Sequence, residues 1–454
     1  MKQYSLTESP VAGTLIRFAL PFMLSSLLQS LYGAADLFVV GRYAGSAAVS
    51  GVSIGSQLMS TVTMLILALS MGGTVLIGNC VGQKNPGGAA RAIGTVTVLF
   101  GIIALLATPA MLLLTNAGVA LMQTPPEAVE SCRTYVFLCS CGLPFIIGYN
   151  AVSGIFRGLG DSKTPVYFVA LACAINIATD FLLVGGLKLG AAGAAIATVA
   201  AQGLSFLAAL LYMLKSGLPF PFSRREHLRL DGASAKRILK VGAPLALQST
   251  AVHLSFLVIT AIINTMGLVA SAAVGVTEKI ICFAMLPPEA FASAVAAMTA
   301  QNIGAGKPKR AITALRCGIG FSLIFGALVC GFSNLWPSVL PAVFTRDSEV
   351  IAAAAQYLRT YSIDCIMVSF VFNFNNYFSG CGNAVISMIH NVIATFAVRI
   401  PVTLWVSRQS WATMFHMGFA APLASLLSIA ICAGYFLWLR RKPGRAVRED
   451  RAEI

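Results

Sequence analysis

Long apolar runs, each about the length needed to cross a lipid bilayer, dominate the sequence. A bilayer core about 30 Å thick is spanned by roughly 20 apolar residues in a helix. We find twelve such runs between polar breaks, near residues 14–39, 48–80, 92–115, 131–157, 165–187, 191–214, 240–265, 271–301, 312–336, 350–379, 384–406 and 411–439. The pattern predicts an all-α membrane protein with twelve transmembrane helices.

The composition excludes a soluble protein. Hydrophobic residues make up 57% of the chain and charged residues 10%, whereas soluble domains carry about 25% charged residues. The 11 cysteines lie mostly inside apolar runs, without a CxxC pair or the spacing of metal ligands. We therefore expect no disulfide framework, no bound metal and no cofactor. No metal-binding acidic motif or nucleotide-binding loop supports a membrane enzyme or transferase.

The formal net charge of +15 reflects membrane orientation. With the N-terminus placed in the cytoplasm, most of the 31 Lys and Arg residues fall on cytoplasmic loops and on the tail. This bias predicts a multi-pass protein of the cell membrane with both termini in the cytoplasm. The partners that we expect are the lipid bilayer and small molecules, without nucleic acid, and we expect a monomer.

The two halves of the chain resemble each other at a shift of about 222 residues. The loop GQKNPGGAARA (82–92) parallels GAGKPKRA (304–311), and FRGLGDSKT (156–164) parallels FSGCGNAVI (378–386). An even number of helices gives both halves the same orientation, so their pseudo-two-fold axis should follow the membrane normal. The predicted parts are an N-lobe at 10–215, a cytoplasmic basic linker at 216–237, a C-lobe at 238–440 and a cytoplasmic tail at 441–454. This is a transporter pattern.

Two acidic residues inside the apolar runs are the first candidates for function. A carboxylate at mid-bilayer costs roughly 2.5–3.5 kcal/mol on insertion scales, and such residues are usually functional. Asp36 lies in the first predicted helix, and Tyr32 and Gln29 share its face by their spacing. Asp180 lies in the fifth helix, one turn after Asn176. A hydroxyl in the sixth helix, Thr198, is placed to donate to this carboxylate, and Pro21 permits a bend in the first helix.

Several segments together resemble the multidrug and toxic compound extrusion (MATE) family over about residues 10–440. In the first half they are PFMLSSLLQSLYGAADLFVVGRYAG, MGGTVLIGNCVGQKN, GIFRGLGDSKTP and AINIATDFLLVGG; in the second they are PLALQST, TMGLVASAAVGVTEKI and TAQNIGAGKPKRA. The resemblance implies two six-helix lobes, alternating access, and export of bulky, often cationic compounds against a proton or sodium gradient.

The resemblance also assigns residues. It is closest to the DinF-like prokaryotic branch, in which an acid in helix 1 and an NxxxD pair in helix 5 form a cation site in the N-lobe. The matching positions here are Tyr32, Asp36, Asn176, Asp180 and Thr198, with Asn150 in helix 4 as a further member. The NorM-like branch places acids in the C-lobe instead. At the corresponding stretch of helix 7 this chain has His253 rather than Glu, which argues against a C-lobe sodium site.

A second polar set lies mostly in the other half and is the candidate substrate cavity. We place in it Gln29, Gln248, His253, Glu278, Glu289, Asn373 and Asn376. Aromatic residues next to the asparagines would suit flat organic cations. The same asparagines also fit hydrogen bonding between packed helices.

The function that these features favour is secondary active antiport. We expect export of amphipathic organic cations, such as drugs or toxic metabolites, in exchange for H⁺, with Na⁺ as the rival coupling ion. One alternative is a flippase for lipid-linked oligosaccharides, a related carrier that usually lines its cavity with cations. A major-facilitator carrier also has six plus six helices, but its signature loop is absent here. A channel is the alternative from a different class.

Overall fold

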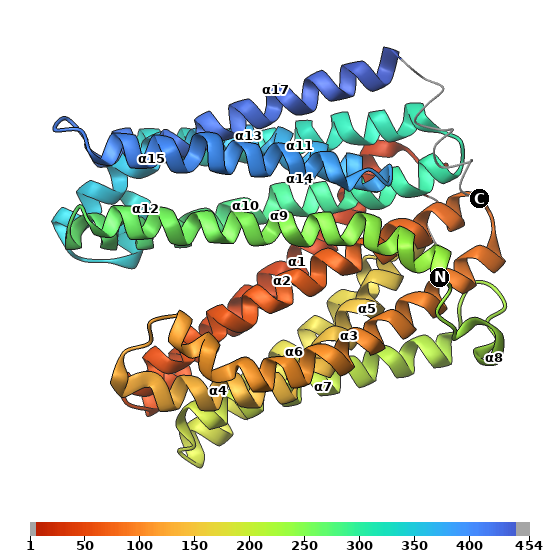
Figure 1. Ribbon diagram of the computed structural model, residues 1–454, viewed down its shortest axis with the longest axis horizontal. Coiled ribbons are helices and arrows are strands. Elements are labelled where there is room, and N and C mark those ends of the chain that lie inside the picture. Colours follow the sequence, from red (N-terminus) through yellow and green to blue (C-terminus); the bar gives the residue numbers. More distant parts are fainter. Residues whose placement is uncertain (1–5, 442–454) are drawn as a thin grey trace. The chain divides into compact units, whose positions relative to one another are not determined.

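The computed structural model describes residues 6–441, which form helices joined by short loops, with no strand in that range (Figure 1). Ten of these helices are long and apolar enough to cross a membrane. A bent pair of helices provides an eleventh candidate span. The prediction of an all-α membrane protein is therefore confirmed, and the arrangement is consistent with twelve spans in two sets. Most of the predicted tail, residues 442–454, lies outside the described residues.

The described chain divides into two compact units. Unit 1 comprises Leu20–Gly242, and unit 2 comprises Leu6–Ala19 together with the chain from Ala243 onward. The helices of unit 1 are α1 (Val11–Tyr43, from Leu20), α2 (Ser46–Gly82), α3 (Pro86–Leu121), η1 (Pro126–Ala128), α4 (Val129–Cys141), α5 (Leu143–Leu159), α6 (Lys163–Asp180), η2 (Phe181–Gly186), α7 (Gly190–Ser216) and α8 (Arg224–His227).

Unit 2 repeats this plan with the second half of the chain. Its helices are α9 (Gly232–Asn264, from Ala243), α10 (Leu268–Gly304), α11 (Pro308–Leu335), α12 (Val339–Phe344), α13 (Ser348–Gly380), α14 (Ala384–Ile393), η3 (Ala394–Arg399), α15 (Ile400–Ser407), α16 (Met414–Met417) and α17 (Ala420–Arg441).

Two predicted spans differ from the simple picture of one straight apolar helix. The run at 131–157 is the bent pair, in which α5 turns by 51° from η1 and α4. The break lies at Gly142, and Pro144 in the first turn of α5 has no N–H to continue the helix. The run at 350–379 is α13, whose 33 residues are long enough. It is not among the ten most apolar helices because it carries buried polar groups such as Asp364 and Asn373.

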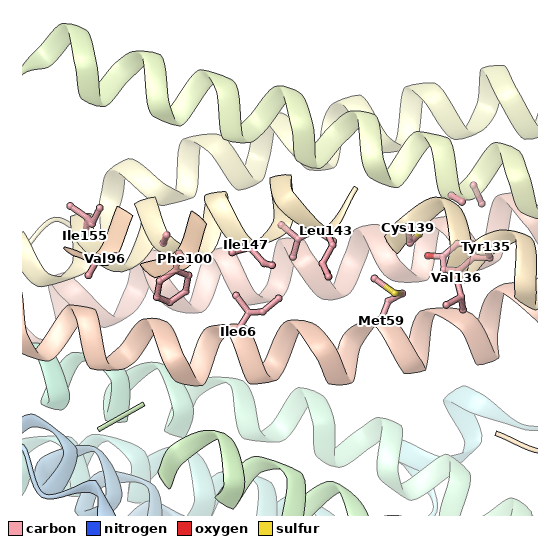
Figure 2. Close-up of a cluster of buried hydrophobic side chains, with 14 of the residues drawn as sticks. Met59, Ile66, Val96, Phe100, Tyr135, Val136, Cys139, Leu143, Ile147 and Ile155 are labelled. Atoms are coloured by element: carbon pink, nitrogen blue, oxygen red, sulfur yellow. The ribbon is translucent and has the colours of Figure 1, made fainter. Parts of the chain in front are cut away.

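The core of unit 1 is a layer of aliphatic and aromatic side chains between α2, α3, α4 and α5. Figure 2 shows Met59 and Ile66 of α2 facing Phe100 of α3 and Leu143 and Ile147 of α5. All five are buried. In lipid, no hydrophobic effect drives helices together, so association depends on close packing and interhelical hydrogen bonds.

Small residues let α2 and α5 approach closely in unit 1. A Cβ atom on Gly158 would lie 2.9 Å from the carbonyl oxygen of Thr74. Across the same contact Ser70 Oγ donates to the carbonyl of Asn150 at 2.8 Å, and Thr74 Oγ1 donates to that of Gly154 at 3.0 Å. These bonds satisfy hydroxyl groups where no water is available.

The same contact recurs between α10 and α13 in unit 2. A Cβ atom on Gly380 would lie 2.7 Å from the carbonyl oxygen of Ala296. The residues of α10 from Ala290 to Asn302 are buried, and most of them are small. The internal repeat read from the sequence is therefore also a repeat of helix contacts.

The first helix of each half begins in the other half's unit, which is a difference from the predicted lobe boundaries. Residues Leu6–Ala19 belong to unit 2, and α1 enters unit 1 at Leu20. The start of α9, up to Gly242, belongs to unit 1, and α9 enters unit 2 at Ala243. A proline follows each crossing by one residue, Pro21 in α1 and Pro244 in α9. A proline removes one backbone hydrogen bond and so lowers the cost of bending a helix at that point.

The N-terminal crossing segment is held by the loop between α10 and α11. Asn302 Nδ2 donates to the carbonyl of Leu6 at 3.1 Å, and Arg310 Nη2 donates to that of Ser9 at 2.6 Å. Arg310 Nε also donates to Asn302 Oδ1 at 3.2 Å, so the two side chains act as one clamp. Lys307 Nζ reaches the carbonyl of Thr7 at 3.1 Å.

The corresponding segment before α9 packs on α3 in unit 1. The backbone N–H of Asp231 donates to Thr95 Oγ1 at 3.3 Å. A Cβ atom on the neighbouring Gly94 would overlap the carbonyl oxygen of His227. This glycine is therefore required by close approach of the two backbones.

We predict that Gly94→Ala destabilises unit 1 by about 1–3 kcal/mol, because the added methyl must displace backbone rather than a flexible side chain. Gly101→Ala is the matched control on the same helix, since nothing lies within 4 Å of its Cβ position. It should be neutral or stabilising by up to about 1 kcal/mol. The measurement is thermal unfolding of both variants in detergent, and equal unfolding temperatures would contradict the close approach.

We predict that Arg310→Ala releases residues 6–9 and speeds hydrogen exchange of their amides, because three of the four clamp bonds depend on Arg310 or on the Asn302 that it orients. Arg316→Ala is the control, since Arg316 is an exposed arginine on the same helix, α11. Unchanged exchange in Arg310→Ala would show that the clamp does not hold the segment.

The start of α9 supplies a prediction about pH. Asp231 Oδ2 accepts from the backbone N–H of Ser234 at 2.8 Å and caps the helix. Hydrogen bonds from the Ser234 side chain and backbone, with smaller contributions from Arg91 and Arg237, hold the pKa of Asp231 below its usual value. The charged form is favoured in the folded state, so this stabilisation is present above about pH 4 and is lost as the pH falls below it.

Asp231→Asn keeps a capping oxygen but removes the charge. Because the group is largely solvated, we expect wild type to be more stable than this variant at neutral pH by less than about 1 kcal/mol. The difference should vanish in acid. Thermal unfolding of both proteins across pH measures it, and a difference that persists in acid would contradict the assigned role of the charge.

Candidate functional site

The predicted cation site lies where α6 changes its helical type. Asp180 is the last residue of α6, and the next turn, η2, is a π-helix. π-Helical turns inside α-helices are rare and occur often at functional sites, because they widen the helix and re-aim the side chains beside them. Asp180 is fully buried, and Asn176, one turn earlier on the same face, is 1% exposed.

Helices α1 and α7 bring the remaining members of the site to this turn. Thr198 Oγ1 of α7 donates to Asp36 Oδ2 of α1 at 3.2 Å. The carboxyl group of Asp36 also lies beside that of Asp180 and the amide of Asn176. The sequence expected Thr198 to serve Asp180, and the structure gives its hydrogen bond to Asp36 instead.

The polar atoms at this point are close together but incompletely hydrogen-bonded. Asp36 Oδ1, both oxygens of Asp180 and both polar atoms of the Asn176 amide are buried without a hydrogen bond among the described residues. Leaving buried polar atoms unpaired costs about 1–3 kcal/mol each, and more for a charged group. Two adjacent carboxylates also repel each other, so they require a proton or a cation between them.

The space beside these groups is very narrow. A crevice lined by Tyr32, Ala172, Asn176, Thr198, Ala201 and Gln202 lies between α1, α6 and α7. It has no room for a water molecule. A proton needs no such space, whereas a hydrated ion would have to lose its water or force the helices apart.

Sequence reasoning missed two neighbours of the site. Gln202 Nε2 donates to the hydroxyl of Tyr32 at 3.3 Å, so Tyr32 is tied to α7 rather than to Asp36. Gln202 follows Thr198 by four residues and therefore shares its helix face, which is a signal that the sequence does contain. Tyr135 of α4 also lies beside Thr198. No sequence spacing could have predicted this contact, because it depends on how α4 packs.

Asn150 was predicted to join the same network, and the structure gives its side chain a different partner. Its Nδ2 donates to the carbonyl of Ile146 in its own helix at 2.8 Å. Its backbone carbonyl accepts from Ser70 in the contact between α2 and α5. In the structure, Asn150 therefore contributes to helix packing.

Asn373, one of the predicted cavity residues, is also a packing residue. It is fully buried, and its Nδ2 donates to Ser322 Oγ of α11 at 3.0 Å and to the carbonyl of Ser369 at 2.7 Å. A Cβ atom on Gly318 would overlap its oxygen. In the structure, Asn373 therefore contributes to helix packing, because both sides of its amide face packed helices.

The side chains of the other predicted cavity residues are at least partly accessible. Gln29 and Glu289 are exposed, and Gln248, His253, Glu278 and Asn376 are partly buried. His253 Nδ1 lies 2.9 Å from the carbonyl of Ser249, and Asn376 donates to Phe372 at 3.0 Å. Gln29 belongs to unit 1 and the rest to unit 2.

Between residues 6 and 441, no group of three or more His, Cys, Asp or Glu side chains is arranged to hold a metal ion. The chemistry at Asp36 and Asp180 is therefore that of a carboxyl pair with one amide and one hydroxyl. Such a set can take up and release a proton or a monovalent cation.

Comparison with known proteins agrees with this architecture. The sequence matches the MatE family twice, over residues 21–182 and 244–405. A "Probable multidrug resistance protein YpnP" of Bacillus subtilis is 28% identical over 97% of this chain and 98% of its own length. The "DNA damage-inducible protein F" of Escherichia coli is 26% identical, with 88% of this chain and 86% of that protein covered.

Solved structures share the fold. A crystal structure of MATE in the straight conformation superposes with a TM-score of 0.89 at 21% identity, covering 99% of both chains. One in the bent conformation has a TM-score of 0.90 at 21% identity, covering 100% of this chain and 99% of the other. The two family matches begin at Pro21 and at Pro244, immediately after each crossing helix changes unit. The chain therefore belongs to the MatE family, and it is a multi-pass membrane transporter rather than an enzyme.

Proposed function

We propose that the protein is a secondary active multidrug efflux antiporter that exports amphipathic organic cations in exchange for protons. The observation that carries this proposal is the buried pair of Asp36 and Asp180, whose facing oxygens have incomplete hydrogen bonding. A pair of this kind changes its contacts when one proton is added, and a transporter needs such a switch to couple an ion gradient to a change of conformation.

The proton is favoured over Na⁺ by the space at the site. The adjoining crevice has no room for water, and sodium would need several oxygen ligands after losing its hydration shell. Asp36, Asp180, Asn176 and Thr198 offer oxygens of the right kind, so Na⁺ is the ion against which the proton must be tested. Neither ion requires a further cofactor.

The coupling step follows from the contacts of Asp36. In its ionised form it accepts a hydrogen bond from Thr198 of α7. A proton arriving from the outer side neutralises Asp36 and weakens the hold of α1 on α7. Pro21 then allows the part of α1 within unit 1 to move while residues 6–19 stay with unit 2. Release of the proton to the cytoplasm restores the bond.

The substrate class is supported by the relatives and by the acids of unit 2. Three relatives are named probable multidrug resistance proteins, and a fourth is named a multidrug export protein. The acidic side chains of Glu278 and Glu289 keep accessible surface and lie about three turns apart on α10. Accessible carboxylates attract organic cations, and together with Gln29, Gln248, His253 and Asn376 they are our candidates for substrate contact.

We further propose that the protein acts as a monomer in the plasma membrane with both termini in the cytoplasm. The distribution of Lys and Arg supports this orientation, because cytoplasmic loops carry the positive excess. Labelling of single cysteines introduced into loops would test it in intact cells.

We predict that Asp36→Asn and Asp180→Asn each reduce efflux driven by an imposed pH gradient by at least about 100-fold, since each removes one protonatable member of the pair. Reconstituted vesicles loaded with a fluorescent organic cation provide the measurement. A pH gradient and a sodium gradient are imposed separately. Wild type should respond to the pH gradient alone.

The matched control is Asp161→Asn, the same chemical change at the opposite end of α6. Asp161 accepts from the backbone N–H groups of Lys163 and Thr164, and asparagine can replace this cap. This variant should transport normally. Full transport by either site variant would refute the coupling role, and efflux by wild type under a sodium gradient alone would replace the proton with sodium.

A further inference from the structure

The counterpart of the cation site in unit 2 has the opposite polarity. The two family matches have equal length and start at Pro21 and Pro244, an offset of 223 residues. At this offset, which is one residue longer than that of the segments FRGLGDSKT and FSGCGNAVI, Asn176 falls on Arg399 and Asp180 falls on Thr403. A guanidinium and a hydroxyl therefore stand where unit 1 has an amide and a carboxyl. Arg399 is the last residue of a π-helical turn, η3, which at the same offset corresponds to residues 171–176 of α6 and is therefore not the counterpart of η2.

The counterparts of the two α1 residues complete this reversal. Asp36 corresponds to Ile259 and Tyr32 to Ser255. Ser255 contacts the guanidinium directly, since Arg399 Nη1 donates to its hydroxyl at 3.4 Å. Thr403 Oγ1 donates to the carbonyl of Arg399 at 2.8 Å. The corresponding positions are therefore assembled as one cluster in unit 2, but they carry no carboxylate.

The guanidinium is held by neutral groups. Arg399 Nη2 donates to the hydroxyl of Tyr361 at 3.3 Å, and its Cζ lies 4.2 Å from the ring centre of Phe256. A cation over an aromatic face at this distance is attracted by the ring quadrupole. Its Nε is buried without a hydrogen bond among the described residues.

Two acids from other positions lie within the field of this cation. Arg399 acts electrostatically on Glu278 of α10 and on Asp364 of α13. Asp364 is 5% exposed, and its Oδ1 has no hydrogen-bond partner in the described chain, while Ser425 of α17 lies beside the carboxyl group. Carboxylates buried in this way need a positive charge nearby. Among the described residues of unit 1, no arginine acts on the carboxyl pair, and an exchangeable ion must supply that charge.

We propose that Arg399 is a tethered counter-ion that determines ion specificity: it takes the place of an exchangeable cation in unit 2 and confines ion coupling to unit 1. A fixed guanidinium keeps the buried Asp364 compensated through the whole transport cycle and offsets part of the charge of Glu278, which keeps accessible surface for the substrate, so no inorganic cation is drawn to this cluster. Without the guanidinium, the same two carboxyls and the hydroxyls of Ser255, Tyr361 and Ser425 become a site for Na⁺. This inference rests on the proposed coupling role of unit 1.

The test measures binding of Na⁺ to purified full-length protein at neutral pH, by radioactive sodium and by thermal stabilisation. All variants are made in protein that already carries Asp36→Asn, a substitution that inactivates the proposed cation site of unit 1. Adding Arg399→Gln should raise sodium affinity by at least about tenfold, and adding Asp364→Asn as well should abolish the gain. Adding Arg399→Lys to the background is the matched control, because it retains a cation at this position, and it should show no gain.

The proposal is overturned if Asp36→Asn/Arg399→Gln responds to Na⁺ no better than Asp36→Asn, or if the lysine variant gains affinity equally. Should the glutamine variant fail to fold, sodium binding to the chain with Arg399 intact decides the question. Sodium bound by the Asp36→Asn protein and lost on further substitution of Asp364 would refute the proposal. Its absence there supports the proposal. Failure of the coupling role would be seen separately, as gradient-driven efflux by Asp36→Asn.

Discussion

The constraint on which this structure depends is that a polar group inside a bilayer must find its partner within the protein. Most polar side chains in the helices meet it locally, by donating to a carbonyl one turn back, as Thr63 does to Met59 and Thr277 to Ala273. Others meet it across helix contacts, as Ser70 and Thr74 do between α2 and α5. Small residues and hydroxyl groups together hold each unit closed where hydrophobic burial contributes little.

A few buried polar side chains do not meet this constraint, because some of their atoms lack a hydrogen bond among the described residues. Asp36, Asn176 and Asp180 lie at one point in unit 1, and Asp364 and Arg399 lie in one cluster in unit 2. Both clusters border a helix with a π-helical turn. Each half thus has a π-helical turn, at a different position of the repeat, and the ionisable group beside the turn is a carboxyl in unit 1 and a guanidinium in unit 2.

The sequence predicted a large part of the fold because apolar length and repeated motifs are local properties. It also predicted that Asp36, Asp180, Asn176 and Thr198 would lie together, because their spacing and polarity are visible within single apolar runs. It did not predict the bend at Gly142, because the apolar run continues through it. Nor did it separate Asn373 from the cavity residues, since an asparagine that binds two helices looks like one that lines a pore. The partnership of Tyr32 with Gln202 required a contact between distant helices.

The sequence also could not predict that the first residues of α1 and of α9 each pack in the unit formed mainly by the other half of the chain. Apolar periodicity shows where a helix begins but not which neighbour its first turns contact. The close approach of Gly242 to the backbone of Leu69, with 2.9 Å between the Cα of Leu69 and a Cβ built on Gly242, reveals which unit owns the start of α9. The structure divides α9 after Gly242 and also places residues 6–19 with the second half of the chain.

This exchange has a consequence for biosynthesis. Residues 6–19 emerge first from the ribosome, yet Asn302 and Arg310, which bind them, are made almost 300 residues later. The start of α1 therefore lacks its final binding partners while unit 1 is being synthesised. Unit 1 is itself complete only when the start of α9 has been added. Neither half can finish folding from its own segment alone. Separately expressed halves should consequently need each other to reach the native state. Because each crossing helix belongs to both units, a defect in the synthesis of one half should also leave the other half incompletely folded.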